Sequence, residues 1–565
     1  MMYDILLLNV YRDTSGYSEC FHDCIGQYLL AAYLRKHDFV AQVYAGTAED
    51  CKKVLEKEVG GGHVRIVGFY AAADNIRVVS HAVKWVKENF DAVTIVGGPQ
   101  AVALKPQFFL ETSNDFAIVG EGEIPMLHLV SYLVDGIGTR EQLPSVKYID
   151  KEKNALVWNR CDQAVIADLD TIPFPHVEDS LTRRLRSGKM AGILTGRGCP
   201  NHCTFCYEGA NAKNVRFRSI PNVMEEIDYI REHNPGIEYL NVYDDTFTLQ
   251  PGRVLEFCRE MKARGLKWFC EGYVSFVIQH PEILQEMVDS GLTCIQFGIE
   301  SGSNQVLAAY NKRTTREMIL QCIQICKESG IHGITGNFII GGARETAETL
   351  EESRKLAADM LKAARGILEL YTVYFAPYPN TRMSSSPEEF GIEMDQELLN
   401  YNLNTMRSPV VRTEALTAKE IYEKKHEFDR FLEEYYRQEA LASKKADVIQ
   451  GMYQDGRRIH VNPTWEAAYL SFHHIDVFLR HMSEEEQQFR PDAYPIRTFD
   501  DFVLDGGKMT AEPGTFEGLE KEILLRASGQ KTAAELSRVL GVTIEEMEAV
   551  FHRLNNRCLL YMSRW

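Results

Sequence analysis

Three cysteines lie close together in residues 198–206 of this chain. Cys199, Cys203 and Cys206 have the spacing C-x3-C-x2-C, and an aromatic residue, Phe205, precedes the last of them. A [4Fe–4S] cluster is normally held by four cysteine thiolates. Three thiolates at this spacing can each bind one iron of such a cluster, which leaves the fourth iron open to a substrate or a cofactor. The segment therefore predicts a [4Fe–4S] cluster with one vacant coordination site.

A structural zinc site is the main alternative for three clustered cysteines. Zinc needs a fourth ligand to complete its tetrahedron, and His202 lies inside the same segment. If the thiols on either side of His202 face one ion, the imidazole points away from that ion. We therefore favour the iron–sulfur interpretation over zinc, and over a chance grouping of buried thiols.

Length and composition limit the possible functions. The chain has 565 residues, which predicts two to four domains. Its formal charge of -18 argues against a nucleic-acid substrate, because phosphate backbones need a basic surface. The 13 scattered cysteines favour a reducing, cytoplasmic environment over a disulfide framework. The sequence predicts no signal peptide and no membrane span.

Residues 1–140 alternate short apolar runs with amphipathic stretches. Apolar runs at 5–10, 64–69, 93–98 and 116–119 suit buried parallel strands, and residues 22–37 suit the first helix between them. This pattern predicts a doubly wound, Rossmann-like α/β domain. Such domains bind ligands at the carboxyl ends of their strands, where this chain has Gly97-Gly98-Pro99 and Gly120-Glu121-Gly122-Glu123.

The next two segments differ in character. Residues 141–190 are expected to form a linker with a short hairpin, in which 146–149 lie opposite 155–158. From 191 to 384 a strand followed by a helix recurs six times, which predicts a partial TIM-like barrel, open on one side. The candidate strands are 192–196, 237–243, 267–273, 293–299, 334–340 and 369–376. The cysteine segment follows the first strand, at the end of the barrel where reactive groups belong.

The cysteine segment and this barrel resemble the radical S-adenosylmethionine (SAM) superfamily. Its signature, C-x3-C-x-aromatic-C, matches the chain at residues 199–206. The resemblance implies that the vacant iron chelates the amino and carboxylate groups of SAM. It also implies that one electron from the cluster cleaves SAM to a 5′-deoxyadenosyl radical. An external electron donor such as flavodoxin or ferredoxin is then expected.

Other motifs at the strand ends resemble the SAM-binding elements of this superfamily. Asp244 and Asp245 are expected near the SAM ammonium, although an aspartate pair after a strand is also typical of a helix N-cap or a turn. Glu300, in a G-x-E-S-G element, is expected to accept hydrogen bonds from the ribose hydroxyls. The other residues expected in the SAM site are Phe205, Ser301, Phe338, Ile340 and Tyr374.

Two later motifs depart from the superfamily pattern. Ala343 replaces a proline after the fifth barrel strand, which leaves the geometry of that turn open. Asn380 replaces a glycine after the sixth strand. Because asparagine tolerates a left-handed backbone, we expect the turn at Asn380 to form.

Residues 1–140 resemble the cobalamin-binding domain that is fused to some radical SAM barrels. That domain often has G-G-P/H after the fourth strand and G-E-G-E after the fifth. The chain has no Asp-x-His-x-x-Gly motif, so no residue is nominated to bind the lower face of cobalt. A nucleotide-binding or ligand-free domain is the alternative. The residues expected to bind cobalamin are Tyr11, Asp13, Tyr70, Gly97, Gly98, Gly120, Glu121 and Gly122.

The remaining cysteines and strand-end tyrosines are less informative. Cys20 and Cys24, and likewise Cys322 and Cys326, are spaced four apart. We expect both pairs to be apolar fillers rather than a second cluster. Tyr70 and Tyr273 follow strands and are open to two interpretations, a contact with substrate or simple packing.

The C-terminal third divides at about residue 510. Residues 385–510 have charged, helical periodicity and are expected to close the open barrel. Residues 511–565 predict a winged-helix-like module, with capping boxes at Thr532 and Thr543 and a terminal strand. Glu545, Glu546 and Glu548 make its second helix a poor DNA reader. We favour a structural cap or dimer contact over binding of a leader peptide.

Together the resemblances predict a cobalamin-dependent radical SAM enzyme. Its expected reaction is methylation of an unactivated carbon in a natural-product or peptide substrate, since such a carbon is not nucleophilic enough for polar methyl transfer. Cyclisation, ring contraction or rearrangement without methyl transfer is the second hypothesis. A non-catalytic cobalamin or redox sensor is the third. No nucleic-acid or membrane partner is expected.

Overall fold

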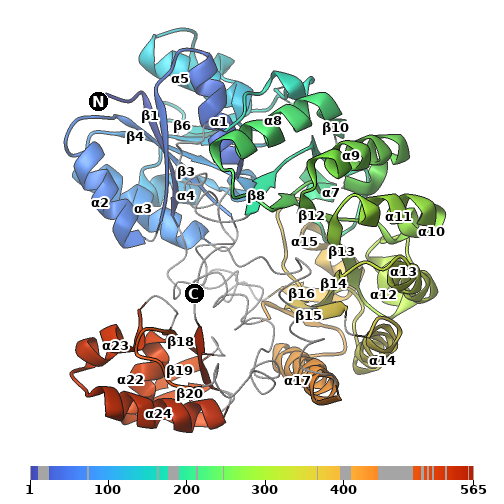
Figure 1. Cartoon of the computed structure of the whole chain (residues 1–565). Helices are drawn as coiled ribbons and strands as arrows, with labels where there is room; N and C mark the ends of the chain where they lie inside the picture. Colours follow the sequence, from blue (N-terminus) through green and yellow to red (C-terminus); the bar gives the residue numbers. More distant parts are fainter. Residues whose placement is uncertain are drawn as a thin grey trace.

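The computed structural model describes residues 2–10, 25–175 and 190–394, apart from 47, 73–74, 162–163, 212–213, 246 and 366, and then 409–442, 488–497 and most of 502–563. These residues form two large sheets with their covering helices and a smaller C-terminal unit (Figure 1). Tyr11, Asp13, Cys20 and Cys24 lie outside the described residues. Across the described ranges, no helix has the length and apolar character of a membrane span.

Seven strands form the first sheet, in the order β2-β1-β3-β4-β5-β6-β7. β1 to β5 run parallel, with β1 in the interior of the sheet. Every residue of β1 is buried, which explains its continuous apolar run. The order 2-1-3-4-5 confirms the predicted doubly wound domain. The strands are β1 (Ile5–Val10), β2 (Ala41–Gly46), β3 (Ile66–Tyr70), β4 (Val93–Gly97), β5 (Phe116–Ile118), β6 (Val146–Asp150) and β7 (Ala155–Asn159).

Helices cover both faces of the first sheet. The core on one face contains residues of α1 (Ile25–Lys36) and α5 (Glu123–Val134). The core on the other face contains residues of α2 (Ala48–Glu58), α3 (Ile76–Asn89) and α4 (Pro106–Thr112). This is the two-faced packing that a mostly parallel sheet requires.

The predicted hairpin exists, but the prediction that it belongs to a linker is wrong. Ile118 of β5 pairs with Val146 of β6 in antiparallel register, and β7 pairs with β6. Val146 and Tyr148 enter the core that contains α1 and α5. The hairpin therefore completes the edge of the first sheet, because this position buries its apolar face.

Six parallel strands form the second sheet, in the order β15-β14-β13-β12-β11-β8. Strands that follow one another along the chain are neighbours in the sheet, with β8 and β15 at its two edges. This arrangement agrees with the predicted partial barrel. The strands are β8 (Met190–Ile193), β11 (Tyr239–Val242), β12 (Lys267–Glu271), β13 (Leu292–Glu300), β14 (Gly333–Ile340) and β15 (Leu368–Tyr374).

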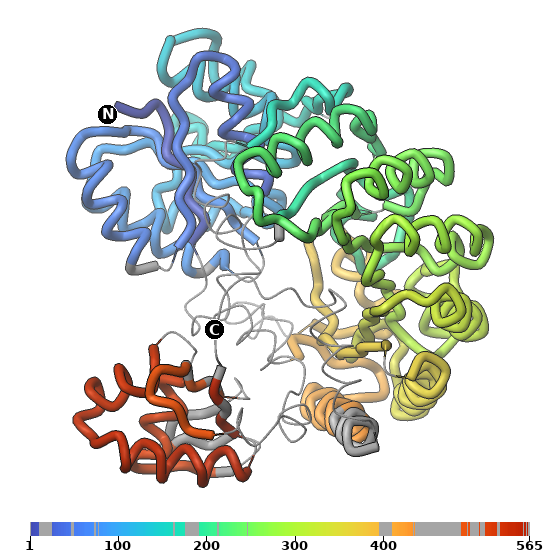
Figure 2. The backbone as a smooth tube through the Cα atoms, viewed as in Figure 1, coloured from blue at the N-terminus to red at the C-terminus, as the bar shows by residue number. Residues whose placement is uncertain are grey.

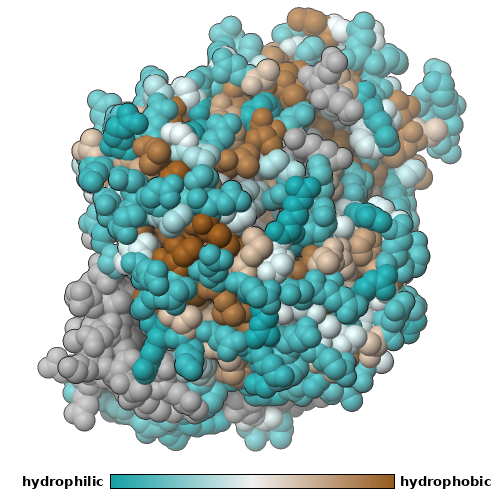
Figure 3. Space-filling view, turned by 90° about the vertical axis from the view of Figure 1, so that its right-hand side faces the viewer, coloured by the Kyte–Doolittle hydropathy of each residue, from teal (hydrophilic) through white to brown (hydrophobic). Residues whose placement is uncertain are grey.

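Five helices lie on the outer side of this sheet, from the upper centre to the lower right of Figure 1. They are α8 (Ile220–His233), α9 (Pro251–Arg264), α11 (Pro281–Asp289), α13 (Arg316–Glu328) and α14 (Ala347–Ala363). One large apolar core joins these helices to the strands, and Cys322 and Cys326 of α13 are fully buried in it, as predicted for apolar fillers. The outward face of this side is mostly hydrophilic, with separate apolar patches (Figure 3).

Helix α17 (Ala418–Ala442) belongs to the region expected to close the barrel. Its Phe428 ring lies 5.2 Å from that of Phe338 on β14, and the Thr372 hydroxyl of β15 donates to Asp429. In its described part α17 therefore covers strands β14 and β15, as a sixth outer helix. The part of the same prediction that falls on residues 443–487 lies outside the described residues.

The C-terminal unit has its own core and occupies the lower left of the chain trace in Figure 2. The capping boxes at Thr532 and Thr543 are confirmed. Strand β18 pairs with β22, so the unit begins before residue 511, earlier than expected. A winged-helix module stays a prediction. The elements are β18 (Tyr494–Arg497), β19 (Phe502–Asp505), β20 (Lys508–Ala511), β21 (Gly514–Phe516), α22 (Gly518–Arg526), α23 (Ala533–Leu540), α24 (Ile544–Asn556) and β22 (Leu560–Ser563).

Short elements complete the described chain. The short strands and α-helices are β9 (Gly196–Arg197), α7 (Tyr207–Asn211), β10 (Arg216–Phe217), α10 (Val274–Gln279), α12 (Asn304–Ala309), α15 (Arg382–Ser385), β16 (Ile392–Met394) and β17 (Val411–Thr413). The 3-10 helices are η1 (Pro99–Ala103), η2 (Arg140–Gln142), η3 (Leu169–Thr171), η4 (Phe247–Leu249) and η5 (Pro387–Phe390).

Candidate metal and cofactor site

The cysteine segment follows β8 and β9, at the carboxyl end of the first barrel strand. Thr204 fixes the cysteine segment to the barrel through three hydrogen bonds. Its backbone N–H donates to Tyr310 O at 3.0 Å, its hydroxyl donates to Ala309 O at 2.9 Å, and its carbonyl accepts from Met383 N at 3.0 Å. His202 is exposed, and its carbonyl accepts from Asn311 Nδ2 at 2.8 Å. The loop is therefore held in place by the barrel before any metal binds.

The arrangement of the three thiols fits a cluster better than a single ion. Among the described residues, no three His, Cys, Asp or Glu side chains are close enough together to hold one metal ion. A tetrahedral zinc site requires that convergence, whereas a [4Fe–4S] cluster takes each thiolate at a different iron. Cys199 is buried, and Cys203 and Cys206 are partly buried. Burial raises the pKa of the Cys206 thiol to about 11, so cluster binding has to displace its proton.

Tyr273 provides a polar partner for one of these thiols. The Tyr273 hydroxyl lies 3.0 Å from Cys199 Sγ. Tyr273 lies two residues after β12, at the N-cap of α10, and its own backbone N–H donates to Thr248 Oγ1 at 2.9 Å. The Tyr273 ring also packs against the barrel core, and a contact with substrate stays a prediction.

Glu300 and Lys312 form an ion pair inside the mouth of the barrel. Lys312 Nζ lies 2.7 Å from Glu300 Oε1, and Asn337 Nδ2 donates to Glu300 Oε2 at 3.0 Å. Glu300 has a φ of 63°, a left-handed conformation that is unusual for a residue other than glycine. Asn311 and Arg313, on either side of Lys312, both have a φ of 54°. Two strained turns therefore direct these charged groups toward each other.

Further carboxylates stand near the pair. Asp245 accepts from the backbone N–H of Gly198, next to Cys199, at 3.2 Å. Burial raises the pKa of Asp245, and burial followed by the charge of Asp245 raises the pKa of Glu271 to about 7. The Glu271 side chain opens to the barrel mouth, yet the walls around it remove much of its water. A cationic ligand here lowers the free energy of ionised carboxylates, which suits a sulfonium compound such as SAM.

Asp244 does not point into the mouth. It is buried, and its two carboxylate oxygens accept from the backbone N–H and the hydroxyl of Thr195. These bonds tie the end of β11 to the chain after β8. The structure therefore favours the turn interpretation for Asp244 and leaves Asp245 as the member of the pair that faces the cysteine loop.

Four other expected SAM-site side chains are buried away from the mouth. Ser301 is fully buried beside Ser353. Phe338, Ile340 and Tyr374 belong to the core between strands and helices. Neighbouring residues of a strand face opposite sides, so Asn337, not Phe338, reaches the interior. Contacts of these four residues with SAM stay a prediction.

Phe205 packs between the cysteine loop and the barrel core. It is partly buried and has its ring centroid 5.0 Å from that of Tyr310. Because Tyr310 also accepts the hydrogen bond from Thr204, Phe205 is fixed together with the cysteine loop. Its contact with adenine stays a prediction.

The strand-end glycines of the first domain lie along one edge of its sheet. Tyr70 at the end of β3 is paired with Gly97 at the end of β4. Gly98 has a φ of 94°, and a Cβ there would stand 2.6 Å from Ala71 O. Only glycine fits at this position. Gly120 follows β5 with a φ of 88°. The expected cobalamin residues that are described therefore follow β3, β4 and β5, where a doubly wound sheet binds ligands.

Glu121 differs from the other residues that were expected to bind cobalamin. It forms ion pairs with two arginines of the barrel domain, at 2.9 Å with Arg197 and at close range with Arg216. Glu123 also reaches Arg197, at 2.7 Å. The Glu121 carboxylate is therefore occupied by the barrel and not turned to a ligand in its own domain. Since Arg197 is two residues before Cys199, the same contacts bring the strand-end edge of the first domain to the cysteine loop.

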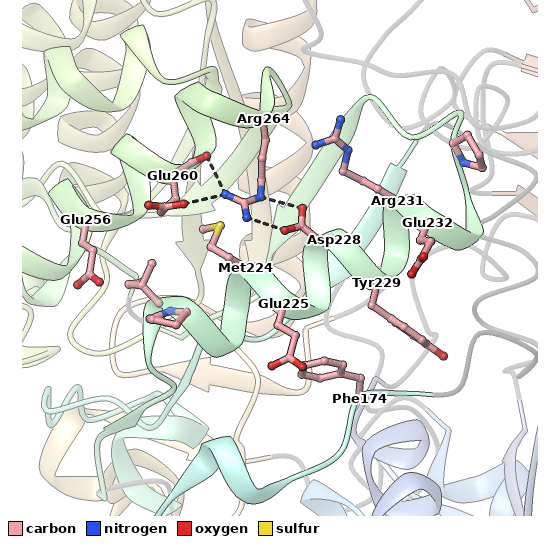
Figure 4. Close-up of a pocket in the computed structure, with 13 residues that line it drawn as sticks. Phe174, Met224, Glu225, Asp228, Tyr229, Arg231, Glu232, Glu256, Glu260 and Arg264 are labelled. Atoms are coloured by element: carbon pink, nitrogen blue, oxygen red, sulfur yellow. Dashed lines mark hydrogen bonds and ion pairs between the residues drawn. The ribbon is translucent and has the colours of Figure 1, made fainter.

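A groove of about 1210 Å³ lies elsewhere, on the outer side of the barrel (Figure 4). Arg264 of α9 crosses it to Asp228 of α8 at 2.6 Å and also pairs with Glu260 at 2.9 Å. None of the cysteines of the loop lines it, and the reactive ends of barrel strands lie on another side. Its lining residues are Phe174, Ile220, Pro221, Met224, Glu225, Asp228, Tyr229, Arg231, Glu232, Pro235, Glu256, Glu260 and Arg264.

Comparison with known proteins identifies the barrel. Residues 193–357 match the radical SAM superfamily, and this range begins just before the cysteine loop and ends within α14. The chain contains a radical SAM domain. Its cofactors are accordingly a [4Fe–4S] cluster and SAM.

Relatives and solved structures extend the likeness beyond the barrel. An uncharacterised methyltransferase of Pyrococcus horikoshii is 27% identical over 407 residues, which are 70% of this chain and 84% of that protein. The anaerobic magnesium-protoporphyrin IX monomethyl ester cyclase of Cereibacter sphaeroides is 28% identical over 369 residues, which are 62% of this chain and 56% of the cyclase.

One solved structure is similar in fold over nearly the whole chain. It is the radical SAM methyltransferase TsrM of Kitasatospora setae with cobalamin and a [4Fe–4S] cluster bound. This structure matches with a TM-score of 0.57 at 14% identity and covers 98% of this radical SAM chain and 99% of that one. The predicted fold, a Rossmann-like domain followed by a partial radical SAM barrel, is confirmed.

Sequence reasoning missed several residues of this radical SAM site. Lys312 and Asn337 complete the network around Glu300, and Arg197 joins the two domains. No spacing or composition signal marks Lys312 or Arg197, since each acts through a partner distant in sequence. Only Asn337 had a usable hint, because it alternates with the buried residues of β14.

Proposed function

We propose that this radical SAM protein is a cobalamin-dependent enzyme that methylates an unactivated carbon of a small-molecule or peptide substrate. One observation carries the proposal. Arg197 joins the strand-end edge of the Rossmann-like domain to the loop of the three cysteines. A cobalamin at that edge and a cluster in that loop would share one reaction space.

The chain's own residues divide the work in the barrel. Cys199, Cys203 and Cys206 would hold the cluster, which with SAM supplies one-electron cleavage and an adenosyl radical. Glu300 offers carboxylate oxygens for the ribose hydroxyls, and Lys312 holds Glu300 in position. A carboxylate at this place orients SAM without reacting with it.

The first domain fits a flat cofactor at the ends of β3, β4 and β5. Gly97 and Gly120 have open space where a Cβ would stand, and Gly98 leaves no room for a side chain. Backbone can therefore approach a ligand closely at this edge. Cobalamin bound here would supply a methyl carrier beside the radical site.

Methylation has support from the names of relatives. The Pyrococcus horikoshii relative is called a methyltransferase, and one structure that matches over nearly the full length is a radical SAM methyltransferase. An unactivated carbon is a poor nucleophile, so radical formation is the reasonable route to its methylation. We extend this reaction class, without its substrate, to the present chain.

Ring formation is the second candidate function. The Cereibacter sphaeroides cyclase is about as similar to this chain as the methyltransferase is, at 28% against 27% identity. The chain spans little more than half of the cyclase, so the cyclase activity does not transfer directly. The mass of the product distinguishes the two reactions, since methylation adds the mass of one methylene to the substrate and cyclisation does not.

The test begins with protein purified without oxygen and supplied with cobalamin. We expect about four irons and four sulfides per chain, bound cobalt, and release of 5′-deoxyadenosine from SAM with dithionite. Cys203→Ala should lose both the cluster and the release. Cys161→Ala, a matched change of a partly buried cysteine in the first domain, should keep them. Bound zinc without sulfide in the unaltered protein would refute the proposal.

A further inference from the structure

Tyr273 occupies a defined position against one candidate cluster ligand. Its hydroxyl is 3.0 Å from Cys199 Sγ, within hydrogen-bonding distance for a sulfur partner. The ring is partly buried against the barrel core, and the Tyr273 backbone N–H is bonded to Thr248. Core packing and the backbone bond therefore hold the phenol beside the thiol from two directions.

Cluster binding decides which atom of this pair donates the proton. A cysteine ligand must be a thiolate, because the metal displaces its proton. A thiolate has no hydrogen to give, so the Tyr273 hydroxyl must donate and Cys199 Sγ must accept. Hydrogen bonds to charged acceptors are the stronger class, which favours this direction.

The three ligands have different surroundings. Backbone N–H groups of Glu208 and Gly209 face Cys206, and the ammonium of Lys312 acts on Cys203. The polar neighbour of Cys199 is the hydroxyl of Tyr273. Carboxylates of Asp245, Glu271 and Glu300 stand in the same mouth and disfavour an added electron. A hydroxyl donor at Cys199 offsets part of that repulsion.

We infer that Tyr273 raises the reduction potential of the cluster by donating a hydrogen bond to Cys199. Reduction places more negative charge on the ligand sulfurs, so a donor stabilises the reduced cluster more than the oxidised one. Hydrogen bonds to sulfur are among the factors that set cluster potentials. The inference rests on the proposed function in one respect, namely that a cluster occupies the cysteine loop.

Tyr273→Phe tests this inference because it removes one oxygen and keeps the ring. Redox titration followed by EPR, without SAM or substrate, gives the potential directly. We expect the ratio of reduced to oxidised cluster at a fixed potential to fall about tenfold, which is about 59 mV for one electron. Tyr229→Phe, in the outer groove, is the matched control and should leave the potential unchanged.

A second variant strengthens the donor. Site-specific 3-fluorotyrosine at position 273 has a more acidic hydroxyl and should raise the potential above that of the unaltered protein. The 3-fluorotyrosine variant tests the role of Tyr273 if the Tyr273→Phe protein does not assemble a cluster. A potential that stays the same in either variant, with full iron and sulfide, would overturn the role of Tyr273 alone. Absence of iron and sulfide from the unaltered protein would instead overturn the proposed function.

Discussion

Arg197 of the barrel domain lies 2.7 Å from Glu123 of the Rossmann-like domain. The arginine side chain is 17% exposed and that of the glutamate 6%, so the pair is largely shielded from water. Glu123 begins α5, and Arg197 ends β9, two residues before the first cysteine of the loop. A movement of the first domain therefore acts directly on the loop that carries the candidate cluster ligands.

We predict that breaking this pair destabilises the protein. Arg197→Gln leaves the Glu123 charge buried without its partner, which should cost about 3 kcal/mol in the free energy of unfolding. Glu123→Gln should have a similar cost, and the double variant should cost less than the sum of the two. Urea unfolding of the three variants measures this coupling.

An ion pair with one exposed partner is the control for that cycle. Arg264→Gln removes the pair with Asp228, whose side chain is 52% exposed, and should cost under about 1 kcal/mol. Strictly additive effects of Arg197→Gln and Glu123→Gln would show that the two residues do not stabilise each other.

Glu300→Gln should weaken SAM binding. The change keeps the shape of the side chain but removes the negative charge that pairs with Lys312 and that we propose accepts from the ribose hydroxyls. A charge-assisted bond contributes about 1.5–3 kcal/mol, so the Kd for SAM should rise roughly tenfold to a hundredfold. Anaerobic calorimetry with the cluster-loaded protein gives the value. The exposed Glu282→Gln is the control, and equal Kd values in both variants would contradict the role of Glu300.

Gly298→Ala should disturb the ion pair between Glu300 and Lys312. A methyl group at residue 298 would overlap Glu300 Oε1 and stand 2.5 Å from Lys312 Nζ. Both are ends of flexible side chains, so they should shift, and SAM affinity should fall about tenfold while the fold persists. SAM titration and thermal unfolding report the two effects separately.

Gly252→Ala, in the first turn of α9, is the matched glycine control. A Cβ there meets no atom within 4 Å, so the protein should keep its SAM affinity and gain about 0.5–1 kcal/mol in stability. If Gly298→Ala bound SAM as tightly as Gly252→Ala, the crowding at Glu300 would have no functional consequence.

Glu345 predicts a pH-dependent stability that needs no bound cofactor. Burial raises the pKa of its carboxyl to about 8, although the N–H groups of Gly341 and Gly342 lower it. The folded state therefore keeps a proton that the unfolded chain loses near its ordinary pKa of 4.5. Between these values folding binds the extra proton, so stability falls as pH rises, by up to about 1.4 kcal/mol per pH unit.

Glu345→Gln should remove this dependence, because its amide does not ionise. The variant should gain stability relative to the unaltered protein as pH increases from 6 to 9, measured by urea unfolding without cluster or SAM. If the free energies of unfolding of the two proteins changed equally with pH, Glu345 would be excluded as the titrating group.

Local features were predicted well from the sequence. The cysteine spacing lies within eight residues, from 199 to 206, so no long-range contact is needed to bring the ligands together. Capping boxes at Thr532 and Thr543 are equally local, and both formed. Asn380 adopts a φ of 63°, as expected for an asparagine in place of glycine. Apolar periodicity also identified both parallel sheets, because burial on two faces leaves a strong sequence pattern.

The direction of single side chains was decided by the tertiary structure. Asp244 and Asp245 are adjacent, and only the fold turns one to Thr195 and the other to the cysteine loop. Phe338 and Asn337 differ in the same way, since consecutive strand residues face opposite sides. Glu121 was expected at a ligand but pairs with arginines more than 70 residues away.

The sequence by itself determined which chemistry this chain can perform, because three thiols at a fixed spacing and the strand pattern are properties of contiguous segments. The tertiary structure alone decided which charges meet. Glu300 with Lys312, Glu123 with Arg197 and Tyr273 with Cys199 are each joined across the fold. Such pairs depend on turns and domain contacts that no local pattern encodes.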